Sequence, residues 1–291
     1  MLYKQQMYYK YAKYKTQYIR LSNGCNLAYI DEGKGDTTLL MVHGLANYAG
    51  VWAKNIESLK EHYRCIAIDL PGNGYSDGGD YLYSINFFSG CVYDFMLKLK
   101  LQNVVPVGHS MGGQVLLNLV INHPTVCEKL VLCAPAGFET FSQLEKTLYK
   151  TSMHFFDFFS TEENSLRKII HASFYHYPKY ADAMLQELVE LMHSQPLSRY
   201  RKMVEACIDG MMEEPVYDRL HTIQQQVLVI YGERDALIPN RLIHHTTTRA
   251  MAEEAVAKMS HVRLEMLTGC GHFVQLEKPG VVNEYIGEFV G

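Results

Sequence analysis

The chain has 291 residues, 48% of them hydrophobic and 20% charged, which is the composition of a folded globular protein. This length suits one α/β domain with an insertion, or two small domains, and allows a large core. The net charge of -4 at pH 7 leaves no basic surface for phosphates, so we expect no nucleic-acid partner. No stretch approaches the roughly 20 apolar residues of a spanning helix, so we expect no integral membrane segment and at most peripheral membrane contact.

Residues 1–18 form a predicted N-terminal extension that is rich in tyrosine and lysine. They lack the apolar segment of a secretory signal. Apolar and aromatic side chains recur there at helical spacing, at Tyr3, Met7, Tyr11, Tyr14 and Tyr18. This spacing predicts a helix packed on the domain or a partly ordered tail, with a helix on a membrane surface as the alternative.

The seven cysteines are odd in number and show neither a C-x-x-C motif nor metal-ligand spacing. Cys65 and Cys133 stand inside apolar runs, where cysteine behaves as a small hydrophobic residue. We therefore expect free thiols, no metal site and a reducing, cytoplasmic location.

Two short strands open the predicted fold, at residues 17–21 and 26–31. The turn signal Ser22-Asn23-Gly24 separates them and favours a hairpin. Apolar runs typical of parallel strands buried on both faces follow at 39–42, 65–68, 104–107, 130–133, 227–231 and 262–267. Segments of helical character lie between most of them, near 52–62, 87–100, 111–122 and 242–259. This alternation predicts an α/β fold with a mostly parallel, doubly wound sheet.

Pro106 interrupts the run at 104–107. A proline has no N–H to donate to a β ladder, so it is out of place inside a central strand. We therefore expect Pro106 to lie near the end of its strand.

The alternation stops between residues 136 and 220. This stretch has no convincing strand and concentrates phenylalanine and methionine, which predicts an inserted helical module. The insertion divides the core into a first part at 19–135 and a second part at 221–291. We expect its side chains to form a core of their own and also to line an apolar pocket, since flexible methionines and flat aromatic rings suit an acyl chain.

Five residues, Gly108-His109-Ser110-Met111-Gly112, stand between an apolar run and a segment of helical character. This is the context of a G-x-S-x-G nucleophile elbow, in which small residues permit a strained turn that lifts the serine hydroxyl clear of the sheet. The pattern predicts Ser110 as a nucleophile.

A serine nucleophile needs a base within reach, and the base needs an orienting acid. Asp235 follows the run at 227–231, and His272 follows the run at 262–267. Because sites in open α/β sheets form at the carboxyl ends of strands, we expect both side chains to converge on Ser110. Glu233 is a competing candidate for the acid.

Two backbone N–H groups are predicted to stabilise an oxyanion. One belongs to Met111, which follows the nucleophile, and the other to Leu45 in the turn His43-Gly44-Leu45. Gly44 would let the backbone approach the substrate, so it is a predicted substrate-binding residue.

Five motifs in this order resemble the α/β-hydrolase superfamily from about Tyr18 to the end of the chain. They are Val42-His43-Gly44, Asp69-Leu70-Pro71-Gly72-Asn73-Gly74-Tyr75-Ser76-Asp77, Gly108 to Gly113, Gly232 to Asp235 and Gly271-His272. The resemblance implies a helical cap after the strand that ends near Ala134. It also implies that Asp235 is the acid rather than Glu233, and that Asp69 and Asp77 have structural roles.

Within the superfamily, the runs Ser110 to Val115 and Cys133 to Gly137 are most similar to monoacylglycerol lipases and related esterases. The epoxide hydrolases and haloalkane dehalogenases of the superfamily carry an aspartate at the elbow. Ser110 therefore argues against both of those chemistries.

Three histidines outside these motifs have structural interpretations. His109 is next to the nucleophile, and we expect its side chain to point away from the site and to pack. His244 and His245 are adjacent, so they point in different directions on a helix, and two solvated histidines are favoured over a metal site.

The sequence thus favours a serine hydrolase that cleaves carboxylic esters of apolar acyl groups through an acyl-enzyme, without a metal or organic cofactor. A C–C bond hydrolase or an aminopeptidase of the same fold is the alternative. An aminopeptidase would need acidic residues facing the site, and candidates are Glu162, Glu163, Glu187, Glu190, Glu205, Asp209, Glu213 and Glu214. A ligand-binding receptor with little turnover is an alternative of another class, which the loss of a triad residue would favour, and none is missing.

Overall fold

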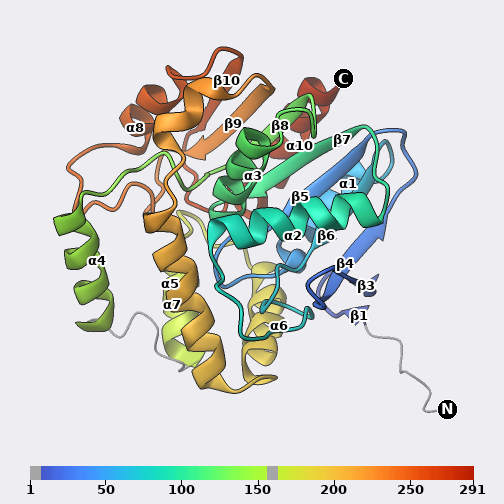
Figure 1. Ribbon diagram of the computed structural model, residues 1–291, viewed down its shortest axis with the longest axis horizontal. Helices are drawn as coiled ribbons and strands as arrows, with labels where there is room; N and C mark the ends of the chain where they lie inside the picture. The colour runs from blue at the N-terminus through green and yellow to red at the C-terminus, as the bar shows by residue number, and fades with distance from the viewer. Residues whose placement is uncertain (1–7, 156–162) are drawn as a thin grey trace.

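A computed structural model of the protein describes residues 8–155 and 163–291. Its centre is an eight-stranded sheet in the order β10-β9-β8-β7-β5-β6-β4-β3 (Figure 1). Strands β5 to β10 run parallel, and the hairpin β3–β4 joins β6 in antiparallel orientation. The strands are β3 (Gln17–Arg20), β4 (Asn26–Glu32), β5 (Thr38–Val42), β6 (Arg64–Ile68), β7 (Val104–His109), β8 (Lys129–Cys133), β9 (Gln226–Gly232) and β10 (Val262–Leu267).

Helices cover both faces of the sheet, so the predicted α/β fold with a mostly parallel, doubly wound sheet is confirmed. Figure 1 shows α2 and α3 in front of the sheet and α1 and α10 behind it. The core helices are α1 (Ala53–Leu59), α2 (Ile85–Lys98), α3 (Met111–Asn122), α8 (Thr248–Val256), α9 (Val274–Glu277) and α10 (Pro279–Val290), with a 3-10 helix η1 at Ala49–Trp52. No helix in the described ranges is both long enough and apolar enough to cross a membrane.

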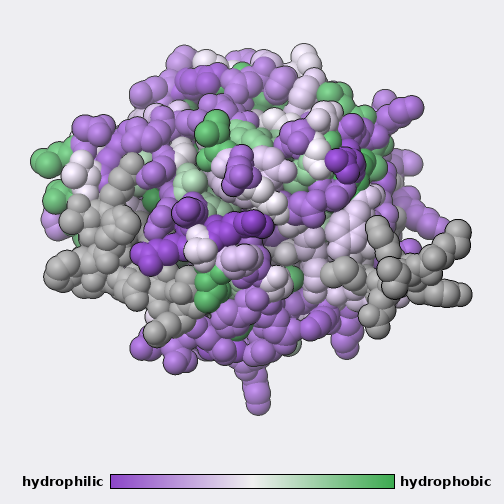
Figure 2. Space-filling view, turned by 60° about the horizontal axis from the view of Figure 1, so that its bottom comes forward, coloured by the Kyte–Doolittle hydropathy of each residue, from purple (hydrophilic) through white to green (hydrophobic). Residues whose placement is uncertain are grey.

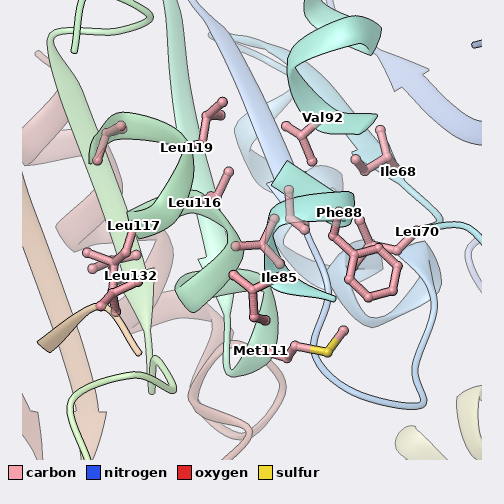
Figure 3. Packing of buried hydrophobic residues seen from close by; sticks show 14 of the residues in the cluster. Ile68, Leu70, Ile85, Phe88, Val92, Met111, Leu116, Leu117, Leu119 and Leu132 are labelled. Carbon is pink, nitrogen blue, oxygen red and sulfur yellow. The ribbon is translucent and has the colours of Figure 1, made fainter. Parts of the chain in front are cut away.

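The two hydrophobic cores follow from the alternation of side chains along each strand. On β5, Leu40 and Val42 belong to the cluster under α2 and α3, whereas Leu39 and Met41 belong to the cluster under α1 and α10. Figure 3 shows the first cluster, in which residues of α2 such as Phe88 meet residues of α3 and of the strands. Burial on both faces explains why these strands read as unbroken apolar runs.

Between β8 and β9, the described residues contain four α-helices and no strand. These helices lie below the sheet in Figure 1. Their outer face is mostly hydrophilic in Figure 2, so most of their apolar side chains turn inward. They are α4 (Gln143–Phe155), α5 (Glu163–Ala172), α6 (Ala181–His193) and α7 (Leu197–Glu213), followed by a 3-10 helix η2 (Tyr217–Thr222).

Three local predictions were wrong. Within residues 8–18, the N-terminal extension forms a hairpin of β1 (Tyr8–Tyr9) and β2 (Tyr14–Lys15) rather than a helix, while Tyr3 and Met7 lie outside the described residues. The helix predicted from residue 242 begins only at Thr248, because the Thr247 side chain caps it by accepting from the Ala250 N–H.

The third is Pro106, which lies inside β7 rather than near its end. Its register partner on β5 is Leu40, and the ladder to β8 begins only at Val107. At the proline, β7 is therefore paired on one side only, which is where a strand tolerates a missing donor.

Candidate active site

Ser110 occupies a strained turn between the end of β7 and the start of α3. Its backbone has φ 54° and ψ −121°, a conformation that is costly for a residue with a Cβ. The turn is tight at Gly108, where an added Cβ would lie 2.7 Å from the Gly112 carbonyl oxygen. Only glycine therefore fits at this position. The serine is partly exposed and lines a cavity of about 580 Å³.

Asp235 and His272 come from the loops after β9 and β10 and meet in the interior. The imidazole Nδ1 lies 2.8 Å from Asp235 Oδ2, and both side chains are buried. Asp235 Oδ1 accepts from the N–H groups of Leu237 and Ile238, which fixes the carboxylate. A carboxylate only accepts, so the ring proton lies on Nδ1 and Nε2 is left as the acceptor.

Ser110 and His272 line the same cavity. Among the described residues, no hydrogen bond joins the serine hydroxyl to the imidazole. Contacts of this kind commonly tighten only when a substrate is bound, so the arrangement is compatible with proton transfer between the two.

Glu233, the competing acid, lies elsewhere. Its carboxylate is 2.6 Å from the Arg249 guanidinium, a hydrogen bond that lowers the pKa of Glu233. The structure therefore brings Asp235, and not Glu233, to the imidazole.

The turn after β5 approaches Ser110 closely at Gly44. A Cβ at Gly44 would lie 2.9 Å from the Cβ of Ser110, so the absence of a side chain permits this approach. Leu45 lines the cavity beside it. Met111 is the first residue of α3, and N–H groups of a first helical turn have no partner within the helix.

His43 fixes the orientation of this turn, a role that the sequence analysis missed. Its Nε2 accepts from the Leu70 N–H at 3.0 Å, so Nδ1 carries the proton and donates to the Gly44 carbonyl at 2.7 Å. Because a trans peptide points its two polar groups in opposite directions, the Leu45 N–H points away from His43. Burial lowers the pKa of His43 to about 4, so the ring stays neutral. The signal in the sequence was the His-Gly pair directly after an apolar run.

His109 does not point away from the site, contrary to expectation. Its Nε2 donates to the His272 carbonyl at 3.2 Å, and its ring stacks on Phe273 with 5.0 Å between centroids. Burial moves the pKa of His109 well below its ordinary value. The prediction that His109 packs is confirmed by its burial. Its direction was predicted wrongly because the prediction considered the elbow alone, whereas the loop after β10 packs against the end of β7. His109 thus supports the loop that carries His272.

His244 is not a solvated histidine either. Its Nδ1 lies 2.5 Å from a carboxylate oxygen of Glu139, and its Nε2 lies 3.4 Å from one of Glu145 on α4. His245 is exposed as expected. Residues 8–155 and 163–291 contain no cluster of histidine, cysteine and acidic residues that could hold a metal ion.

Asp77 holds a turn, as expected, because its carboxylate accepts from the backbone and side-chain N–H groups of Asn26. Asp69 is also structural in its contacts, accepting from the backbone N–H groups of Ala49 and Tyr75.

The cavity that Ser110 and His272 share is mainly apolar. Its walls come from the core loops and from the helices between β8 and β9, and they include Leu166, Ile169, Val204, Ile208, Met211 and Leu237. Polar groups in the lining include Asn47, Glu139, Arg201 and Arg241. A mainly apolar space with a few polar groups is the usual form of a small-molecule site.

A strained serine elbow, a buried acid–imidazole pair and a parallel sheet together define a hydrolase of the α/β class. The family model described as "alpha/beta hydrolase fold" matches residues 37–279. The chain belongs to this family.

Curated relatives are 23–26% identical and differ in activity. "Epoxide hydrolase 2" of Caenorhabditis elegans is 25% identical over 94% of this chain and 79% of that protein. "Monoacylglycerol lipase abhd6-B" of Xenopus laevis is 23% identical over 83% and 72%, respectively. "2-hydroxy-6-oxo-6-phenylhexa-2,4-dienoate hydrolase" of Comamonas testosteroni is 26% identical over 90% of both. Hydrolysis is what these relatives share.

Among solved structures, an esterase from Exiguobacterium antarcticum superposes with a TM-score of 0.80 at 22% identity. The match covers 94% of this chain and 98% of that one. At this identity, the likeness establishes the fold.

Proposed function

We propose that the protein is a serine hydrolase that cleaves carboxylic esters of apolar acyl groups. The hydrogen bond between Asp235 and His272 is the observation that carries this proposal. It orients an imidazole that lines the same cavity as Ser110. The family is established, and the serine chemistry and the ester substrate are what we add to it.

In the proposed mechanism, Ser110 Oγ attacks the ester carbonyl carbon while His272 Nε2 takes the hydroxyl proton. Asp235 holds the imidazole tautomer and stabilises the imidazolium that forms. The N–H groups of Leu45 and Met111 donate to the oxyanion, and Gly44 leaves room for the substrate. His272 then protonates the leaving alcohol, and water hydrolyses the acyl-enzyme by the same steps in reverse. The residues named need no metal or organic cofactor for these steps.

We propose that residues 136–220 form a cap between core segments 19–135 and 221–291, with 1–18 as an N-terminal extension. Apolar side chains from α5 and α7 line the cavity, which favours an acyl chain as their ligand.

The free state of all seven cysteines supports our proposal of a cytoplasmic location.

The alternatives have less support. An aminopeptidase needs a free carboxylate for the substrate ammonium, and Glu139 is the one acidic residue among the described residues that line the cavity. Glu139 already accepts from the Asn240 N–H and binds His244. Glu162 lies outside the described residues, and the other acids of 136–220 named above do not line the cavity. Epoxide hydrolysis in this superfamily uses an aspartate where this chain has Ser110.

A panel of chromogenic esters from acetate to octanoate, run beside aminoacyl amides and a vinylogous diketone, tests the proposal. Each methylene buried contributes about 0.8 kcal/mol, so kcat/KM is expected to rise up to about fourfold per carbon until the cavity is full. Turnover of the amides or the diketone above every ester would move the aminopeptidase or the C–C hydrolase ahead. Binding without turnover of any of them would favour a receptor.

A further inference from the structure

The N-terminal hairpin is enclosed between the core and α6. Tyr9 is fully buried, and its hydroxyl donates to Asp69 Oδ2 at 2.8 Å. Its ring meets the edge of Tyr75 at 5.0 Å between centroids. A surface tail would not bury a tyrosine in this way, so the hairpin is an integral part of the packing around the core loops.

Glu187 of α6 is the acceptor on which the hairpin converges. The consecutive N–H groups of Lys10 and Tyr11 donate to its two carboxylate oxygens at 2.7 and 2.8 Å. The hydroxyls of Tyr75 and Tyr48 donate to the same oxygens at 2.7 and 2.9 Å. The side chain is 2% exposed, and these four donors satisfy a charge that would otherwise be costly to bury.

These contacts connect directly to the walls of the cavity. Tyr48 follows Asn47, which lines the cavity, and Ala49 is held by the Asp69 carboxylate at 2.6 Å. Within α6, Met192 lies five residues after Glu187 and is another residue of the cavity lining. One buried carboxylate therefore joins the hairpin, the loop after Leu45 and a helix of the proposed cap.

We propose that Glu187 is a positioning residue that uses the N-terminal hairpin to fix α6 and the 45–49 loop, and thereby sets the length of acyl group that the cavity accepts. The acyl part of this statement rests on the proposed ester hydrolysis. The alternative is that packing against α5 and α7 holds α6 without help from the hairpin.

The test compares Glu187→Gln with the matched control Glu190→Gln. Glu190 lies one turn further along α6 and pairs with the exposed Lys10 ammonium. Because exposed ion pairs contribute little, Glu190→Gln should leave hydrogen exchange and ester kinetics as in the wild type. In Glu187→Gln, an NH₂ group replaces one carboxylate oxygen. One of the two backbone N–H groups of the hairpin then faces a donor and loses its acceptor. Hydrogen–deuterium exchange is expected to accelerate about tenfold or more in peptides covering both 8–15 and 181–193 of Glu187→Gln alone.

The kinetic arm measures KM and kcat for acetate and octanoate esters in the same variants. A loosened wall should raise KM for octanoate several-fold in Glu187→Gln and leave acetate turnover within about twofold. Unchanged exchange in 181–193, or an unchanged ratio of octanoate to acetate, would overturn the proposal. If Glu187→Gln does not fold, Tyr48→Phe removes one donor and must give smaller changes in the same direction.

The two arms separate this proposal from the proposed function. Absence of ester turnover in the wild-type protein would reject the ester hydrolysis, whereas the exchange measurement decides the role of Glu187 in placing α6 without any substrate.

Discussion

At the scale of single residues, the side chains around Ser110 are held by their neighbours rather than left to find their own positions. Asp235 accepts hydrogen bonds from two backbone N–H groups in addition to its contact with His272. His43 is hydrogen-bonded at both ring nitrogens. Fixed groups of this kind lower the cost of reorganisation during a reaction. Substitutions that keep the shape of a side chain and change one proton should therefore have the clearest effects on these groups.

Asp235→Asn is such a substitution. The amide is expected to leave the fold intact but to favour the wrong imidazole tautomer, which lowers kcat by roughly 10⁴. The control is Glu233→Gln, which breaks a surface pair with Arg249 and should retain near-normal kcat. Ester turnover kinetics of the two purified variants decide the point. Collapse of the Glu233 variant with a functional Asp235 variant would reverse the two roles.

His43 makes stability depend on pH. Burial lowers its pKa from 6.5 to about 4, so the unfolded chain takes up a proton in this range before the folded one does. The free energy of unfolding should therefore fall as the pH falls from 6.5 to 4, by about 3 kcal/mol from this residue. Denaturant titrations of the wild type and His43→Gln across this range measure that contribution, since Gln can still accept from Leu70.

Asp69 acts in the opposite sense, because burial raises its pKa to about 7 and its contribution weakens as the pH rises from about 4 to 7. It is present in both proteins and cancels in the comparison. Equal pH dependence in wild type and His43→Gln would show that His43 is not the titrating group.

At the scale of elements, the sequence predicted the strands whose apolar pattern follows directly from burial. Strands buried on both faces gave apolar runs such as 39–42 and 227–231, and both became strands within two residues of the predicted bounds. The N-terminal extension was misread because tyrosines at helical spacing also occur in a hairpin whose rings pack on tertiary partners. Tyr9 meets Asp69, 60 residues away, and no local pattern records such a contact.

The candidate site divides in the same way. Ser110, Asp235 and His272 were predictable because each follows a strand, and the carboxyl ends of parallel strands share one edge. The supporting contacts of His109 and Glu187 were not predictable, since they join residues 112 or more positions apart for which the sequence has no periodic signal. These contacts belong to the packing of loops and not to the pattern of elements.

At the scale of the whole molecule, the sheet, the helices below it and the N-terminal hairpin meet around one mainly apolar cavity. The proposed reactive groups follow strands at the carboxyl edge of the sheet, and the helices between β8 and β9 supply most of the apolar wall. The hairpin lies between the core and α6 and ties the two together. The central claim is that this arrangement activates Ser110.

Labelling with a fluorophosphonate probe, which phosphonylates an activated serine, tests that claim most directly. Intact-protein mass spectrometry should show one adduct on the wild type and peptide mapping should place it on Ser110, while Ser110→Ala should take up no label. Persistent labelling of Ser110→Ala, or a wild type that stays unlabelled while correctly folded, would contradict the account.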